Sequence, residues 1–148
     1  MAKAILCVCM GNTCRSPMVE ALVRQGLAER GIEAQVESCG LLDELLEGKF
    51  TTANEHSIEM MSHEGIDISG HEPRHVSVVG DIGSFDAIIA VTDSVKSTLI
   101  ELGADGERIV VLNGANGGVP DPYEKGRDAY VQCIATIKGA LPDVIAVL

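Results

Sequence analysis

A cysteine, a glycine and an arginine stand close together near the start of the chain, in the stretch CMGNTCRSP from Cys9 to Pro17. A thiolate is a strong nucleophile, and the planar guanidinium of Arg15 can hold two oxygens of a tetrahedral phosphate. Gly11 permits a backbone conformation that other residues resist. These residue types predict a cysteine that attacks a bound phosphoryl group.

The stretch joins an apolar run, Ala4–Cys9, that predicts a buried strand to an amphipathic pattern, Pro17–Arg30, that predicts a helix ending at Gly31. Ser16 is expected as the N-cap of this helix and Pro17 as its first residue. Amide groups at such a junction have no partner within the helix and can converge on an oxyanion. We therefore expect a phosphate-binding loop made of Met10, Gly11, Asn12, Thr13, Cys14 and Arg15.

Two polar side chains of the same stretch are expected to support Cys9. Groups that bind phosphate also stabilise a sulfur anion, and Ser16 could donate a further hydrogen bond to it. Asn12 could fix the loop through its side-chain amide. A zinc site at Cys7, Cys9 and Cys14 is disfavoured because the spacing lacks a paired C-x2-C knuckle. No metal and no cofactor are expected.

Short apolar runs alternate with longer amphipathic ones along the chain, which is typical of a parallel sheet covered by helices. Further strands are predicted at Ala34–Ser38, Asp86–Val91 and Arg108–Leu112, and further helices at Thr52–Glu64, at Asp93–Leu102 with Thr92 as cap, and from about Glu124 to Leu141. The pattern predicts one α/β domain over residues 1–148, with a four-stranded parallel sheet and helices on both faces. The segment between Gly65 and Phe85 has no clear period.

The composition excludes several classes of partner. The net charge of -11 would repel nucleic acid and anionic membranes. No stretch is long and apolar enough to span a membrane, and the first residues lack the cleavage region of a signal peptide. The five cysteines are irregularly spaced and are expected to be reduced thiols. We expect a cytoplasmic protein.

Transfer of a phosphoryl group to Cys9 also needs an acid that protonates the leaving group. Asp121 is the candidate, because its loop NGGVPDPYEKG follows the last predicted strand and so lies at the same edge of the sheet as Cys9. Pro120 and Pro122 stiffen the backbone on either side. From the local sequence alone, Asp121 could equally be an ordinary turn residue.

The chain resembles the low molecular weight protein tyrosine phosphatases over nearly its whole length. VCMGNTCRSP is similar to their Cys-x5-Arg-Ser signature, SGHEPRH to their His-x-x-Arg segment, FDAIIAVT to their third strand and DPY to their acid motif. The resemblance implies a phospho-cysteine at Cys9, oxyanion binding by Arg15 and proton transfer by Asp121. It also implies that His71 buttresses Asn12, and that the substrate is a phosphorylated protein or peptide.

The resemblance further implies that Cys14 protects an oxidised nucleophile as a reversible disulfide, since Cys9 and Cys14 share one short loop. Where tyrosine-specific members have an aromatic wall, this chain has Leu45 or Glu44, which leaves Tyr123 as the obvious aromatic wall of the substrate pocket. Thr13 stands where tyrosine phosphatases commonly carry an aliphatic residue.

Three activities follow as hypotheses from this comparison. Thr13 resembles the protein arginine phosphatases of the same family, whose threonine can contact the guanidinium of phosphoarginine. Phosphotyrosine is placed ahead because that activity is more widespread in the family. An arsenate reductase is disfavoured for two reasons. No cysteine lies between Cys39 and Cys133, and Pro17 stands where the arsenate reductases of this fold tend to have glutamine.

Overall fold

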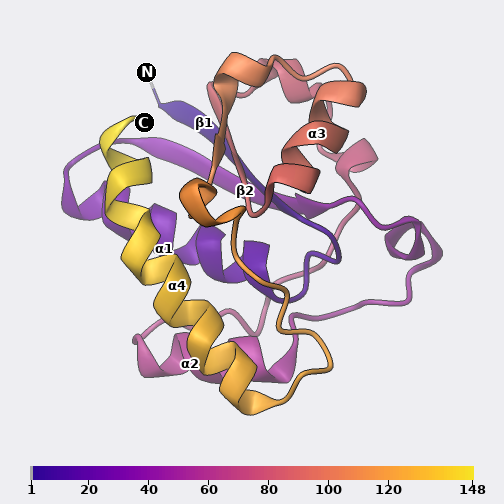
Figure 1. Ribbon diagram of the computed structural model, residues 1–148, viewed down its shortest axis with the longest axis vertical. Helices are drawn as coiled ribbons and strands as arrows, with labels where there is room; N and C mark the ends of the chain where they lie inside the picture. The colour runs from indigo at the N-terminus through magenta and orange to yellow at the C-terminus, as the bar shows by residue number, and fades with distance from the viewer. Residues whose placement is uncertain (1) are drawn as a thin grey trace.

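A sheet of four parallel strands forms the centre of the computed structural model, which describes residues 2–148 (Figure 1). The strands are β1 (Lys3–Cys9), β2 (Ala34–Gly40), β3 (Ala87–Ala90) and β4 (Ile109–Val111). They lie side by side in the order β2-β1-β3-β4, and each pair is parallel. The predicted four-stranded parallel sheet is therefore confirmed.

The carboxyl ends of the central strands lie together. Cys9, the last residue of β1, is in register with Gly40 of β2, and Val8 is in register with Ala90 of β3. The chain passes from β1 to β2 on one side and later returns to β3 on the other side of β1. Ligand-binding crevices of open α/β sheets form beyond the strand ends at such a reversal of order.

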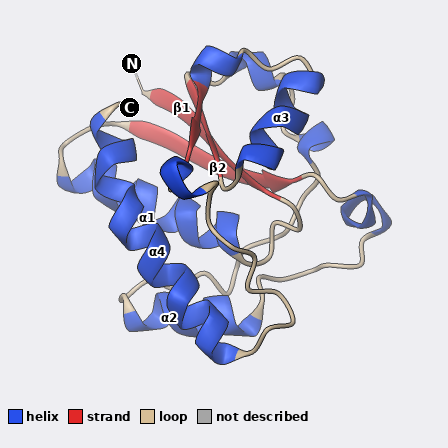
Figure 2. Cartoon of the chain, in the orientation of Figure 1, coloured by secondary structure: helices blue, strands red, loops and turns tan. Residues whose placement is uncertain are grey.

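Helices cover both faces of the sheet (Figure 2). One side carries α1 (Arg15–Glu29), α2 (Glu55–His63) and α4 (Arg127–Ala146), and the other carries α3 (Asp93–Glu101). The described residues also form short 3-10 helices, namely η1 (Asp43–Glu47), η2 (Val76–Val78), η3 (Ile82–Ser84), η4 (Gly106–Arg108) and η5 (Gly114–Asn116). Within residues 2–148, no helix has the length and apolar character needed to cross a membrane.

The core is built on β1, which is covered on both faces. Ile5, Leu6, Cys7 and Val8 have no exposed surface, and this double burial explains why the strand is a continuous apolar run rather than an alternating one. Cys39 and Cys133 are also buried. Burial raises the pKa of each of these two thiols to about 12, so both stay neutral.

Two helix starts differ from the prediction. The N-cap of α1 is Cys14, and the helix begins at Arg15, so the expectation that Ser16 caps it is wrong. The N-cap of α2 is Asn54, whose side chain accepts from the amide of His56. By contrast, Thr92 caps α3 as predicted, because its hydroxyl accepts from the amide of Val95 at 3.1 Å.

The last helix is displaced toward the C-terminus relative to the predicted span. Glu124 and Gly126 both have a left-handed backbone, so α4 cannot start before Arg127. The helix then continues through Pro142 to Ala146, although a proline removes one helical hydrogen bond. Burial of Val144 and Ile145 beyond the proline offsets that loss.

Candidate active site

The loop between β1 and α1 turns its carbonyl groups outward. Four of its carbonyl oxygens are held by segments that surround the loop. The contacts are Met10 O with the amides of Leu41 and Leu42 (2.8 and 3.0 Å), Asn12 O with His71 Nε2 (2.8 Å), Thr13 O with the amide of Asn54 (2.8 Å) and Cys14 O with Ser57 Oγ (3.3 Å). Because successive peptide carbonyls point outward, the intervening N–H groups are free to face the centre of the loop.

These inward amides form a cradle above Cys9. No atom of residues 2–148 accepts a hydrogen bond from the N–H groups of Gly11, Thr13 and Cys14. Together with the first amides of α1, whose dipole adds positive potential, they suit an oxyanion. The pocket over the cradle is lined by Cys9, Met10, Gly11, Thr13, Cys14, Arg15, Leu42, Phe50, Asp121 and Tyr123.

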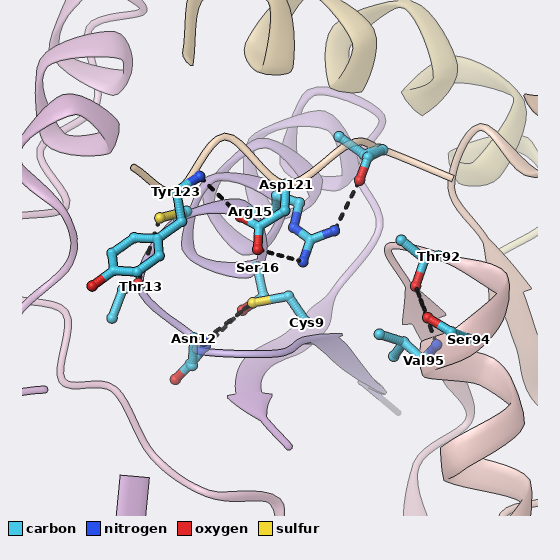
Figure 3. A network of polar contacts seen from close by, with 12 residues as sticks. Cys9, Asn12, Thr13, Arg15, Ser16, Thr92, Ser94, Val95, Asp121 and Tyr123 are labelled. Atoms are coloured by element: carbon cyan, nitrogen blue, oxygen red, sulfur yellow. Dashed lines mark hydrogen bonds and ion pairs between the residues drawn. The ribbon is translucent and has the colours of Figure 1, made fainter. Parts of the chain in front are cut away.

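The sulfur of Cys9 forms the floor of the cradle (Figure 3). Cys9 is only 2% exposed. Its sulfur lies 2.9 Å from the hydroxyl oxygen of Ser16 and accepts from the amide of Asn12 at 3.2 Å. A thiolate at this position could accept both hydrogen bonds, and a hydrogen bond to an anion is stronger than one to a neutral acceptor.

Asn12 is the buried residue that fixes the loop conformation. Its backbone is left-handed, with φ of 52°, a conformation that asparagine tolerates better than most residues. Its Nδ2 donates to Ser16 Oγ at 2.7 Å and to Ser38 Oγ at 3.0 Å, and its Oδ1 accepts from the amide of Arg74 at 2.9 Å. The side chain thus ties the loop to β2 and to the segment before η2.

His71 supports the same residue from the other side. Its Nε2 lies 2.8 Å from the carbonyl oxygen of Asn12, and since a carbonyl only accepts, Nε2 carries the hydrogen. Burial lowers the pKa of His71, which opposes a charge on the ring. The neutral tautomer with hydrogen on Nε2 fits this contact.

Gly40 lets the end of β2 approach the loop. A Cβ atom at this position would lie 2.5 Å from the carbonyl oxygen of Met10, 2.7 Å from Leu45 Cδ1 and 3.0 Å from the amide nitrogen of Asn12. Only glycine fits there. This glycine lies two residues beyond the predicted strand Ala34–Ser38, and nothing in the local pattern indicates what packs against it.

Arg15 and Asp121 approach each other at the edge of the pocket (Figure 3). Arg15 is only 4% exposed, and its Nη1 donates to the carbonyl oxygen of Val119 at 2.8 Å. Its Nη2 lies 3.7 Å from Asp121 Oδ2, while Asp121 Oδ1 accepts from the amide of Tyr123 at 3.0 Å. The carboxylate, 47% exposed, can therefore reach both the bound anion and solvent.

Two aromatic residues line the pocket. The structure brings Phe50 to it together with Tyr123, and Leu42 completes the apolar part. The expectation that Leu45 forms a wall is wrong, because its side chain is buried and points toward Gly40. Phe50 was not predicted from the sequence, because it lies in the irregular segment between η1 and α2, where no period indicates the place of a side chain.

Cys14 lies against α4. Its sulfur is 3.1 Å from the hydroxyl oxygen of Tyr130 and 3.5 Å from Thr13 Oγ1, and burial raises the pKa of the Cys14 thiol. All five cysteines are free thiols in the structure. The disulfide between Cys9 and Cys14 stays a prediction. Within residues 2–148, no three His, Cys, Asp or Glu side chains gather where they could hold a metal ion.

Comparison with known proteins agrees with this geometry. The family model described as low molecular weight phosphotyrosine protein phosphatase matches residues 4–148. The chain is 31% identical over 141 residues to the probable low molecular weight protein-tyrosine-phosphatase EpsP of Ralstonia nicotianae, which covers 93% of this chain and 90% of that protein. It is also 31% identical over 136 residues to the protein-arginine-phosphatase of Bacillus subtilis, covering 86% of this chain and 85% of the other.

Solved structures give the same result. A low molecular weight protein tyrosine phosphatase from T. tengcongensis superposes with a TM-score of 0.85. The two sequences are 27% identical, and the match covers 99% of this chain and 100% of that one. The family model and the solved structure therefore each match this chain over nearly its whole length.

Proposed function

Because the chain belongs to the low molecular weight phosphotyrosine protein phosphatase family, we propose that it hydrolyses phosphotyrosine in proteins or peptides through a phosphoryl group carried on Cys9. The observation that supports this proposal most directly is the sulfur of Cys9 beneath the amide cradle, with Arg15 and Asp121 at the edge of the same pocket. A nucleophile, an anion site and an acid thus converge on one centre.

In the first step, the sulfur of Cys9 attacks phosphorus. The S–P bond forms as the P–O bond to the substrate breaks, and the electron pair of that bond leaves with the phenolic oxygen. Asp121 donates the proton that this oxygen takes up. The amide cradle and Arg15 hold the oxygens of the transferring group, so the charge of the transition state meets fixed donors.

In the second step, water attacks the phospho-cysteine. Asp121, now a carboxylate, accepts a proton from the water as the P–O bond forms and the S–P bond breaks. The electron pair of the broken bond returns to the sulfur of Cys9. Ser16 and the amide of Asn12 stabilise the resulting sulfur anion.

The aromatic lining favours phosphotyrosine as the substrate. Phe50 and Tyr123 both line the pocket over the cradle, and a phenyl ring that stacks on aromatic side chains gains contact area. Tyr123 is about half-exposed, so it can border a ring that enters from solvent.

Phosphoarginine is the second candidate substrate. Thr13 also lines the pocket, and its hydroxyl can accept a hydrogen bond from a guanidinium N–H group. The protein-arginine-phosphatase of Bacillus subtilis has the same 31% identity to this chain as the tyrosine phosphatase named above, over 136 rather than 141 residues. The hydroxyl group of Thr13 is thus the feature of the pocket that supports phosphoarginine as the substrate.

The free thiols favour a reducing cellular compartment for this protein. All five cysteines are free, among them the proposed nucleophile, and thiols persist in reducing compartments. We therefore place the enzyme in the cytoplasm. The net charge of -11 makes nucleic acid an unsuitable partner.

The test compares two peptides of the same sequence, one with phosphotyrosine and one with phosphoarginine, by phosphate release. We expect a higher kcat/KM for phosphotyrosine. The variant Thr13→Ile should raise the preference for phosphotyrosine further if the hydroxyl contacts a guanidinium. Faster hydrolysis of phosphoarginine would contradict the main proposal, and an unchanged ratio in Thr13→Ile would remove the argument from Thr13.

A further inference from the structure

The segment of residues 113–119, here called the clasp, connects β4 to the proposed acid. It begins at Asn113, whose backbone is left-handed with φ of 58°, and contains η5. It then turns through Gly117 and Gly118, with φ of 82° and 124°. Pro120 follows the clasp, and Asp121 is the next residue.

Backbone contacts fasten the clasp to the end of β3 and the start of α3. The amide of Val119 donates to the carbonyl oxygen of Val91 at 2.7 Å, and the amide of Asp93 donates to that of Gly117 at 3.1 Å. Gly118 forms an isolated antiparallel bridge with Thr92. Figure 3 shows Thr92 with its contacts to Ser94 and Val95 at the start of α3.

The clasp carries the oxygen that orients Arg15. Arg15 Nη1 donates to the carbonyl of Val119, which leaves Nη2 to face the pocket and Asp121. Val119 has no exposed surface, so this carbonyl is held in the interior. Because Asp121 lies only two residues after Val119, any shift of the clasp would move both the guanidinium of Arg15 and the carboxyl group of Asp121.

Gly118 is the point of closest approach. A Cβ atom there would lie 2.3 Å from the carbonyl oxygen of Val91 and 2.5 Å from Cα of Thr92. That carbonyl oxygen is the one that accepts from Val119. A side chain at Gly118 must therefore push the clasp off β3, because both obstacles are backbone atoms.

Asn113, the first residue of the clasp, makes two hydrogen bonds with Gly118 near the other end. Its Nδ2 donates to the carbonyl oxygen of Gly118 at 2.9 Å, and its own carbonyl oxygen accepts from the amide of Gly118 at 3.1 Å. Asn113 thus holds Gly118 through both of its backbone polar groups.

We propose that Asn113 and Gly118 are positioning residues of the phosphatase reaction, which act by holding the Val119 carbonyl against Arg15 and Asp121 at the pocket edge. This inference rests on the proposed function of the site. Neither residue lines the pocket over the cradle. Both act on binding of the phosphoryl group through Arg15 and on protonation of the leaving group through Asp121.

The test uses Asn113→Ala and Gly118→Ala, with Gly114→Ala as the matched control. Gly114 belongs to the same clasp, but a Cβ atom there meets only the Val111 side chain, at the ordinary distance of 3.5 Å. Two readouts are needed. One is kcat/KM for p-nitrophenyl phosphate and for phenyl phosphate, whose leaving group is more basic, and the other is the inhibition constant of inorganic phosphate.

We expect Asn113→Ala to lower kcat/KM by about tenfold for phenyl phosphate and by less for p-nitrophenyl phosphate, since a displaced acid matters most for a poor leaving group. The inhibition constant of phosphate should rise several-fold, because Arg15 loses its orientation. Gly118→Ala should show larger effects in the same direction, and Gly114→Ala none. If Gly118→Ala fails to fold, Asn113→Ala alone tests the positioning role of the clasp.

Two results would overturn the inference. One is a folded Asn113→Ala enzyme with wild-type kcat/KM on both substrates and a wild-type inhibition constant. The other is an equal loss on both substrates with phosphate binding unchanged, as a purely structural role would give. Failure of the proposed function itself would look different, because the wild-type protein would then not hydrolyse either phosphate ester. Phosphate binding, measured by calorimetry, would still test the clasp in that case.

Discussion

The hydroxyl oxygen of Ser16 lies 2.9 Å from the sulfur of Cys9, the proposed nucleophile. The side-chain amide of Asn12 donates to Ser16 Oγ at 2.7 Å and so occupies a lone pair of that oxygen. A thiolate can only accept, so the hydroxyl of Ser16 is the donor of this contact once Cys9 is an anion. Asn12 therefore holds in place the hydroxyl that stabilises the nucleophile in its anionic form.

Replacement of Ser16 by alanine should slow formation of the phospho-cysteine. A hydrogen bond to a charged group contributes about 1.5–3 kcal/mol, so the rate should fall by roughly ten- to hundredfold. Stopped-flow release of p-nitrophenol measures this step. Ser62→Ala is the control, since it removes an exposed hydroxyl on α2, and its effect should stay within about threefold. Equal rates in wild type and Ser16→Ala would refute the proposed role.

Replacement of Asp121 by asparagine should remove the acid and keep the shape of the side chain. We expect kcat/KM for phenyl phosphate to fall by about 10²–10⁴-fold, and that for p-nitrophenyl phosphate to fall less. Asp128→Asn, an exposed residue in the first turn of α4, serves as the control and should match wild type. A uniform loss on both substrates would assign Asp121 a role other than proton transfer.

Removal of the aromatic ring of Phe50 should affect the organic part of the substrate rather than the phosphoryl group. Phe50→Ala is expected to lower kcat/KM for a phosphotyrosine peptide by about tenfold, mainly through KM, and to leave the inhibition constant of inorganic phosphate unchanged. Leu46→Ala is the control, because Leu46 is exposed on η1 and does not line the pocket. An unchanged KM in Phe50→Ala would remove Phe50 from the substrate site.

The burial of His71 predicts a pH dependence of stability. Burial holds the pKa of His71 below its ordinary value of 6.5, so the unfolded chain binds more protons between the two values and stability rises with pH. The contribution of His71 is complete above about pH 6.5 and is lost as the pH falls toward the folded-state pKa. Urea unfolding at about pH 7.5 and about pH 5.5 measures it.

The comparison is between two histidine variants. His71→Gln keeps an N–H donor for the Asn12 carbonyl but cannot be protonated, so the free energy of unfolding should depend less on pH than in wild type. His63→Gln changes an exposed histidine at the end of α2 and should follow the wild-type curve. A His71→Gln curve parallel to that of wild type would show that the ring is not the titrating group.

The sequence predicts the parts of the site that lie in one continuous stretch. Cys9, the loop amides and Arg15 follow from residue types at a strand–helix junction, and Asp121 follows from its place after the last strand. Ser16 illustrates the limit, because serine before proline is typical of an N-cap, yet α1 begins at Arg15, two residues before the predicted start at Pro17. The hydroxyl is thereby left for Cys9 rather than for a backbone amide of the helix.

The parts that the sequence does not reveal depend on long-range contact. Phe50 reaches the pocket because of the path of the irregular segment before α2, and Leu45 turns to the interior instead. Gly118 looks like any loop glycine until β3 is seen against it. Such contacts have no period, and therefore no pattern in one sequence indicates them.

The central claim is that the phosphoryl group passes through the sulfur of Cys9. The most direct measurement mixes the enzyme rapidly with p-nitrophenyl phosphate, quenches it with acid within the first turnover and identifies the modified peptide by mass spectrometry. A phospho-cysteine mechanism predicts one phosphoryl group on the peptide that contains Cys9, and none in Cys9→Ser, which should also lose turnover while it still binds inorganic phosphate. Continued turnover by Cys9→Ser, or a phosphoryl group on another residue, would contradict it.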